Sequence, residues 1–270
     1  MGKKLKRDEK SPSGGDGASV MQRIVSQPRV FKVFNARESG ATGTVAAFAR
    51  LQGHPLQVTR ILAVRHGETA WNRDTRIQGH TDIELNDHGR QQAAQLAQAL
   101  RDEPIAACYA SDLLRALETA QVVARTRDQT VTTHVGLRER CFGRFEGHTW
   151  TELEQRFPEE SLAWRKRVPD FAPAGGESLL QLEARVVSTV EELAARHPGE
   201  QILMVAHGGV LDILYRAATR LSLQAPRSWE LTNTAVNRLL WSPEGLSLVG
   251  WADTRHLQSD HGKTLDERNA

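Results

Sequence analysis

The chain has 270 residues, of which 39% are hydrophobic and 25% are charged, a composition typical of a globular protein with a full hydrophobic core. Residues 1–20 hold five basic and three acidic side chains, which accounts for the whole formal charge of +2 and leaves residues 21–270 neutral. A nucleic-acid binder is expected to carry surplus positive charge on its folded part, and no apolar run reaches the length of a membrane span, so the sequence argues against both classes.

In chain order, residues 1–20 are expected to be a disordered basic tail, and a weak anchor for an anionic surface is the alternative reading. Residues 21–59 form a poorly defined extension with no clear periodicity. No apolar stretch follows the basic start, so a secretory signal is not expected. Cys108 and Cys141 make neither a metal-binding spacing nor a disulfide framework, which favours a cytoplasmic location.

From residue 60 onward, apolar runs of strand length alternate with segments of helical periodicity. The strands are expected at 60–65, 105–111, 130–135 and 201–207, with a final pair within 235–251. The helices are expected at 86–102, with Asn86 as N-cap, and at 112–125, 177–197 and 210–220. This alternation predicts an α/β fold, a mostly parallel sheet with helices on both faces, in which ligands bind beyond the carboxyl ends of the strands.

Charged and imidazole side chains follow three of these strands. Arg65 and His66 end the first strand, His207 ends another, and Arg115 lies one helical turn after a third. Each residue alone is most simply a hydrogen-bonded or solvated structural residue. Together, beside Gly67 and Gly208, they indicate a site that a ligand approaches closely.

The residue types point to phosphate chemistry. Two arginines offer forked donors that match a tetrahedral oxyanion, and helix starts expected after Gly67 and Gly208 would add backbone N–H groups. A metal site is disfavoured, since no carboxylate or cysteine lies at ligand spacing and a cationic pocket repels a metal ion. Attack on phosphorus by a neutral histidine is the favoured reaction.

Six segments then match, in order, the motifs of a known family. They are RHGETAWN, GHTDIELNDHGRQQA, ASDLLRALETA, LRERCFGRFEG, GGES and VAHGG, and the region from about 60 to 255 resembles the histidine phosphatase superfamily, in its phosphoglycerate mutase-like branch. The resemblance implies a three-layer α/β/α sandwich with a small cap at about 142–176, followed by a C-terminal tail at 256–270. It also implies catalysis without a metal or other cofactor.

The resemblance also assigns roles residue by residue. His66 matches the nucleophile that becomes phosphorylated, and Arg65, Arg115 and His207 match the phosphate-binding residues. Glu139 matches the proton donor and acceptor, although the residues alone would make it a surface ion-pair partner. The substrate pocket is expected to include Asn72, Gln78, Gly79 and Gly208.

The reaction and the substrate remain open at this point. The short segment between FEG and AHGG resembles the cap of the broad-specificity phosphatases and favours a phosphomonoester hydrolase over a cofactor-dependent phosphoglycerate mutase. A catalytically silent phospho-ligand binder is a further alternative, disfavoured because His66 and Glu139 are both present. The basic cluster at 165–167 is expected on a solvated helix face, and the aromatic residues Phe142, Phe145, Trp150 and Trp164 in cap packing or in an apolar pocket. The expected partner is a small phosphorylated metabolite, and the sequence leaves the oligomeric state undetermined.

Overall fold

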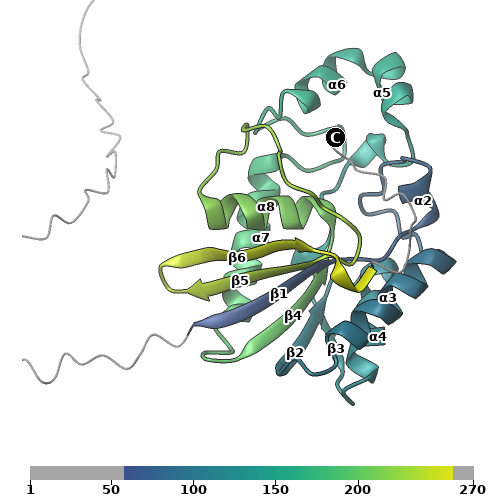
Figure 1. Cartoon of the computed structure of the whole chain (residues 1–270). Coiled ribbons are helices and arrows are strands. Elements are labelled where there is room, and N and C mark those ends of the chain that lie inside the picture. The colour runs from purple at the N-terminus through teal and green to yellow at the C-terminus, as the bar shows by residue number, and fades with distance from the viewer. Residues whose placement is uncertain (1–57, 258–270) are drawn as a thin grey trace, which may run out of the picture. The chain divides into compact units, whose positions relative to one another are not determined.

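The computed structural model describes residues 58–257, and the predictions for 1–20 and 21–57 and for the tail beyond 257 fall outside these residues. The described chain folds into one six-stranded sheet with helices on both faces (Figure 1). Its strands are β1 (Thr59–Arg65), β2 (Ile105–Ala110), β3 (Val131–Thr133), β4 (Gln201–Ala206), β5 (Val236–Ser242) and β6 (Gly245–Asp253).

The sheet is mostly parallel, as predicted. The strand order is β3-β2-β4-β1-β5-β6, in which the first four strands are parallel and β5 and β6 form an antiparallel hairpin at one edge. Strands β1 and β4 are neighbours in register, with Arg65 opposite Ala206. The residues that follow these two strands therefore start from the same edge of the sheet.

Alternation along the central strands divides the core into two clusters. Leu62 and Val64 face helices α3 (Asp87–Ala99) and α4 (Leu114–Arg125), with Leu96 and Val123 among their buried partners. Ile61 and Ala63 of β1 face α7 (Leu179–Ala194) and α8 (Gly208–Thr219). Because side chains alternate along a strand, a strand buried on both faces reads as a continuous apolar run, as RILAV does.

The predicted helices form with the expected boundaries to within a few residues. Asn86 caps α3 by accepting the Gly89 N–H at 2.7 Å, and Ser178 begins α7 with a capping box. The strand predicted at 130–135 is shorter, since the His134 side chain accepts the Gly136 N–H and begins the 3-10 turn η2 (Val135–Leu137).

The cap comprises two short helices, α5 (Trp150–Arg156) and α6 (Pro158–Arg165), preceded by the 3-10 turn η3 (Gly143–Phe145). They lie beyond the strand ends (Figure 1). Phe145 is fully buried there and packs against Phe157 and Trp164, with ring centroids 5.9 and 5.8 Å away. Outside cap and sandwich, the one-turn helix α2 (Ala70–Arg73) and the 3-10 turn η4 (Arg255–Leu257) complete the described elements. No helix within residues 58–257 is long and apolar enough to cross a membrane.

Candidate active site

His66 lies directly after β1 and only 2% of its surface is exposed. Its Nδ1 lies 2.7 Å from the carbonyl oxygen of Gly67. A carbonyl can only accept a hydrogen bond, so Nδ1 carries the proton and the lone pair is left on Nε2. Burial, with the positive charges of Arg115 and Arg65, holds the pKa of His66 well below its usual range. His66 is therefore a neutral imidazole with its nucleophilic nitrogen defined.

His207 is the N-cap residue of α8 and is completely buried. Its ring centroid lies 5.2 Å from that of His66. Burial, and then Arg115, lowers the pKa of His207 well below the ordinary value. Neither of its ring nitrogens has a hydrogen-bond partner among the described residues. Because a buried polar atom without a partner is costly, this side chain is built to meet a ligand.

Two buried guanidinium groups flank the histidines. Arg65 donates to the Leu231 carbonyl at 2.6 Å, and Arg115 on α4 donates to the carbonyls of Gly79 and Thr81 at 2.7 and 3.1 Å. Burial lowers the pKa of Arg115 to about 10, so the group remains charged at neutral pH. Two positive charges beside two neutral imidazoles form a pocket that favours an anion.

Glu139 is held against the N-terminus of α8. The Gly209 N–H donates to both carboxylate oxygens, at 3.0 and 3.1 Å, and the Arg140 N–H donates to Oε1 at 2.7 Å. A Cβ on residue 209 would lie 2.3 Å from Oε1, so the close approach of Glu139 requires glycine at this position. The helix start thus binds the carboxylate that the sequence would otherwise place on the surface.

Arg185 on α7 fixes the backbone that carries Glu139. Its guanidinium donates to the carbonyls of Gly136, Arg138 and Glu139 at 2.9, 2.9 and 3.2 Å. Glu177 in turn accepts two hydrogen bonds from Arg185, at 2.7 and 2.9 Å. This explains the glutamate of the GGES segment as a support for the Glu139 loop.

Glu146 ties the loop that holds Arg115 to the segment that carries Glu139. Its carboxylate accepts hydrogen bonds from the backbone of His80 at 3.0 Å, from the backbone and hydroxyl of Thr81 at 2.9 and 2.7 Å, and from the Phe142 N–H at 3.0 Å. The His80 side chain also bonds the Glu139 carbonyl at 2.8 Å.

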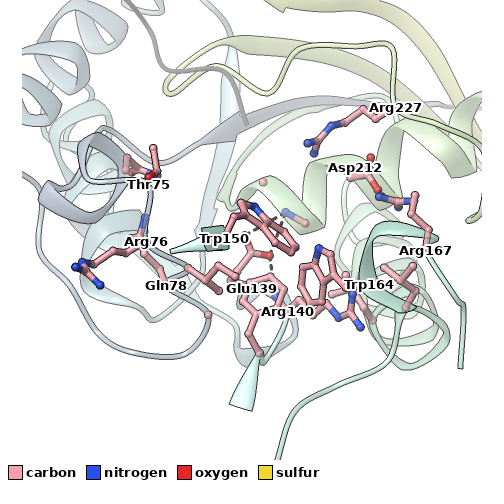
Figure 2. A pocket seen from close by; sticks show the side chains of 18 of the residues that line it. Thr75, Arg76, Gln78, Glu139, Arg140, Trp150, Trp164, Arg167, Asp212 and Arg227 are labelled. Carbon is pink, nitrogen blue, oxygen red and sulfur yellow. Dashed lines mark hydrogen bonds and ion pairs between the residues drawn. The ribbon is translucent and has the colours of Figure 1, made fainter. Parts of the chain in front are cut away.

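The site opens into a cavity of about 970 Å³ between the strand ends and the cap. All four predicted pocket residues, Asn72, Gln78, Gly79 and Gly208, line it together with Arg65, His66, Arg115 and Glu139. In Figure 2, Thr75, Arg76 and Gln78 lie on one side, Arg167, Asp212 and Arg227 on the other, and Glu139, Trp150 and Trp164 between them. The structure therefore brings every predicted site residue except His207 to the cavity wall, and His207 contacts the His66 ring.

Two expectations differ from the structure. The Gly67 N–H donates to the Thr119 hydroxyl at 3.0 Å, and α2 begins only at Ala70, so the first strand end offers no helix start. The second strand end does, since α8 begins at Gly208. Arg167 is not on a solvated face: its backbone adopts φ +50°, which turns the side chain toward Asp212 on α8, 2.6 Å away.

Several residues of the site were not found in the sequence. Gly209, Arg140, Arg185 and Glu146 hold Glu139 or its loop, and Arg167 and Arg227 line the cavity. The second glycine of VAHGG was a usable signal for Gly209. Apart from Arg185, which lies on α7, the other residues lie on loops or in the cap, where no periodicity in the sequence predicts the path of the chain. Of the four aromatic residues, Phe142, Trp150 and Trp164 line the pocket, whereas Phe145 packs inside the cap.

Comparison with known proteins finds matches over most of the described residues. The family model of the histidine phosphatase superfamily (branch 1) matches residues 61–254. Phosphoglycerate mutase-like protein 4 of Arabidopsis thaliana is 38% identical over 214 residues, 78% of this chain and 92% of the relative. The metal-independent phosphoserine phosphatase of the same plant is 38% identical over 206 residues, 75% of this chain and 85% of the relative.

A solved structure is similar over the same region. Phosphoserine phosphatase from Entamoeba histolytica, in complex with 3-phosphoglyceric acid, superposes with a TM-score of 0.66 at 30% identity. The match covers 74% of this chain and 99% of that one. A mutant of that enzyme was solved with phosphoserine.

Proposed function

The chain belongs to the histidine phosphatase superfamily and is a phosphomonoester hydrolase that works through a phosphohistidine, and we propose that the phosphohistidine forms on His66 with Glu139 as acid and base. The observation that carries this assignment is the neutral His66, which keeps its lone pair on Nε2 and lines the cavity together with two buried guanidinium groups. Histidine at this position attacks phosphorus while Arg65, Arg115 and His207 bind the phosphoryl oxygens.

The reaction proceeds in two steps. In the first, the Nε2 lone pair of His66 forms the N–P bond, the bond from phosphorus to the ester oxygen breaks, and Glu139 gives its proton to the departing alcohol. In the second, Glu139 takes a proton from water, the water oxygen attacks phosphorus, and the N–P bond breaks to release phosphate and neutral His66. The α8 N-terminus, which binds the Glu139 carboxylate through Gly209, stabilises the ionised form between the steps.

The substrate is a small phosphorylated metabolite, bound with its phosphate at His66 and its remainder in the cavity lined by Asn72, Gln78, Gly79 and Gly208. The similar enzyme structures were solved with phosphoserine and with 3-phosphoglyceric acid, which supports this class. Catalysis proceeds without a metal ion, consistent with the metal-independent relative. A cytoplasmic location is proposed on the free thiols of Cys108 and Cys141.

Trapping of the phosphoenzyme tests the assignment. Wild type mixed with a radiolabelled aryl phosphate and quenched in base should retain label that is lost in acid, as phosphohistidine is. His66→Ala should retain none, and His88→Ala, a histidine outside the cavity, should label like wild type. Label on His66→Ala would show that the nucleophile is another residue.

A further inference from the structure

The position of the His66 lone pair depends on the direction of one peptide group, the one between Gly67 and Glu68. Its carbonyl oxygen lies 2.7 Å from His66 Nδ1 and accepts the ring proton, which leaves the lone pair on Nε2. If this peptide turned over, its N–H would face Nδ1, and the neutral ring would have to carry its proton on Nε2. The proposed attack on phosphorus would then lack its electron pair. Whatever fixes this peptide therefore fixes the nucleophile.

The turn that contains this peptide packs closely on the start of α3. A Cβ on Gly67 would lie 2.6 Å from the carbonyl oxygen of Gly89, so the close approach requires glycine at position 67. Glycine also has the widest range of backbone dihedral angles, and a peptide next to it turns over more easily than one between two other residues. The direction of the Gly67 carbonyl therefore needs a restraint from outside the turn.

Gln92 on α3 supplies that restraint. Its Oε1 accepts the Glu68 N–H at 2.9 Å, and this N–H belongs to the same peptide as the Gly67 carbonyl. The amide nitrogen of Gln92 points the other way, 3.1 Å from the His88 ring, so its two contacts are separate. Only 2% of Gln92 is exposed, and water cannot easily replace it. A reversed peptide would bring two acceptors, the Gly67 oxygen and Gln92 Oε1, face to face at a buried position, which is costly.

The preceding peptide, between His66 and Gly67, is held by other residues. Its carbonyl accepts from Asn233 at 2.7 Å, and its N–H donates to the Thr119 hydroxyl at 3.0 Å. Thr119 in turn donates to the Arg115 carbonyl at 2.7 Å. These contacts fix the backbone of His66, and they lie on the other side of Gly67 from the peptide that Gln92 holds. The backbone and the ring of the nucleophile thus have separate supports.

From these contacts we infer that Gln92 is a positioning residue for catalysis, which acts through the Gly67–Glu68 peptide to hold His66 in the tautomer whose Nε2 can attack phosphorus. The inference rests on the proposed function, since it requires His66 to be the nucleophile. Gln92 is not among the residues that line the cavity, whereas Arg65 and Arg115 are. Its loss should therefore slow formation of the N–P bond and leave phosphate binding by the two arginines intact.

Substitution of Gln92 tests this inference. Gln92→Met keeps the length of the side chain and removes the amide acceptor. With 4-nitrophenyl phosphate, the rate constant of the nitrophenolate burst should fall about tenfold or more, while the inhibition constant of inorganic phosphate stays within about threefold. Gln92→Glu keeps an oxygen for the Glu68 N–H and should restore the burst to within about threefold of wild type. Gln91→Met, the same change at an exposed glutamine of α3, is the matched control.

Nitrogen NMR of protein with isotope-labelled histidine reads the tautomer directly. In the free wild-type enzyme, His66 should show a protonated Nδ1 and an unprotonated Nε2, with His66→Gln identifying the resonances. Gln92→Met should show a population with the proton on Nε2, and Gln92→Glu should not. Gln92→Leu is a second apolar variant if Gln92→Met does not fold. A wild-type ring protonated on Nε2 would overturn the inference without any variant.

The outcomes separate this inference from the proposed function. A wild-type burst and tautomer in Gln92→Met would overturn the inference, while the phosphatase assignment would stand. A slowed burst with an unchanged tautomer would show a merely structural role and would also overturn it, as would a loss of phosphate affinity as large as the loss of rate. Phosphoenzyme that still forms in His66→Ala would instead overturn the proposed function on which the inference rests.

Discussion

The imidazole rings of His66 and His207 lie 5.2 Å apart, fully enclosed, and both are held neutral by burial and by Arg115. Neutrality leaves His66 the lone pair that the proposed attack on phosphorus requires, and it would allow His207 to hydrogen-bond a phosphoryl oxygen. The same arrangement makes folding sensitive to pH, since two imidazoles that gain protons readily in water are prevented from doing so in the fold.

Stability should fall as the pH drops below the ordinary histidine value. The unfolded chain binds protons on both rings below about pH 6.5, whereas the folded chain, with lowered pKa values, does not. Stability from this pair is therefore complete above about pH 7 and is lost at up to about 1.4 kcal/mol per pH unit for each ring below it. Urea unfolding of the free enzyme at pH 7.5 and 5.5 measures this loss. The double variant His66→Gln/His207→Gln should show a shallower dependence, and an identical dependence would contradict the explanation.

Glu139→Gln should separate the two chemical steps. Glutamine keeps the shape but can neither give nor take the proton, so turnover of an alkyl phosphate should fall by about 10²–10⁴. With 4-nitrophenyl phosphate the leaving group needs no proton, so a burst of nitrophenolate should persist and be followed by slow hydrolysis of the phosphoenzyme. Rapid-quench kinetics with both substrates checks this. Loss of the burst together with turnover would assign Glu139 a binding role instead.

Glu146→Gln should weaken phosphate binding through Arg115. The carboxylate orders the loop whose Gly79 and Thr81 carbonyls hold that guanidinium. The inhibition constant of inorganic phosphate should rise about tenfold, a loss of about 1.4 kcal/mol. Glu160→Gln, which removes a carboxylate paired with Arg144 in the cap, is the control. An unchanged constant in Glu146→Gln, with the fold intact by circular dichroism, would show that the loop holds its geometry unaided.

Removal of metal ions should leave the rate unchanged. Dialysis against EDTA followed by an assay on 4-nitrophenyl phosphate should give the wild-type kcat, because the arginines and His207 supply the charge and hydrogen bonds that a metal would otherwise provide. Loss of activity that Mg²⁺ or Zn²⁺ restores would oppose the phosphohistidine mechanism proposed for His66.

Hydrolysis should dominate over phosphoryl transfer between substrate positions. With 3-phosphoglycerate and its bisphosphate cofactor, we expect release of inorganic phosphate and no accumulation of 2-phosphoglycerate. Water reaches the phosphoenzyme through a cavity whose cap consists of only two short helices, α5 and α6. Phosphorus NMR of the mixture distinguishes the products, and a build-up of 2-phosphoglycerate would favour the mutase reading.

The sequence predicted best those site residues that lie at the ends of regular strands and helices. His66 and His207 follow strands whose apolar runs are unmistakable, and parallel neighbours must end at one edge, so their meeting could be deduced. Arg115 followed from its place in the first turn of α4. Arg167 was misplaced because its side chain direction depends on one left-handed backbone residue after α6, which helical periodicity does not report.

Contacts made by loops could not be deduced for the same reason. Glu146 and Arg185 contact backbone groups of other segments, and backbone acceptors leave no pattern in the sequence. The Gly67 amide was expected to face phosphate, but its N–H donates a hydrogen bond to the hydroxyl of Thr119, 52 residues later. Such a pairing depends on how α4 packs under the sheet edge and not on local sequence.

The segment between α8 and β5 contacts both ends of the site. Its Leu231 carbonyl holds Arg65, Asn233 donates to the His66 carbonyl at 2.7 Å, and Arg227 lies on the distant wall. An insertion or deletion in this loop would disturb the position of His66 along with that of the distant cavity wall. Among the described residues, no hydrogen bond joins the cap helices α5 and α6 to His66 or His207. Evolution, or a designer seeking a new substrate, can therefore exchange the cap at little cost to the chemistry, whereas the loop must be inherited as a unit.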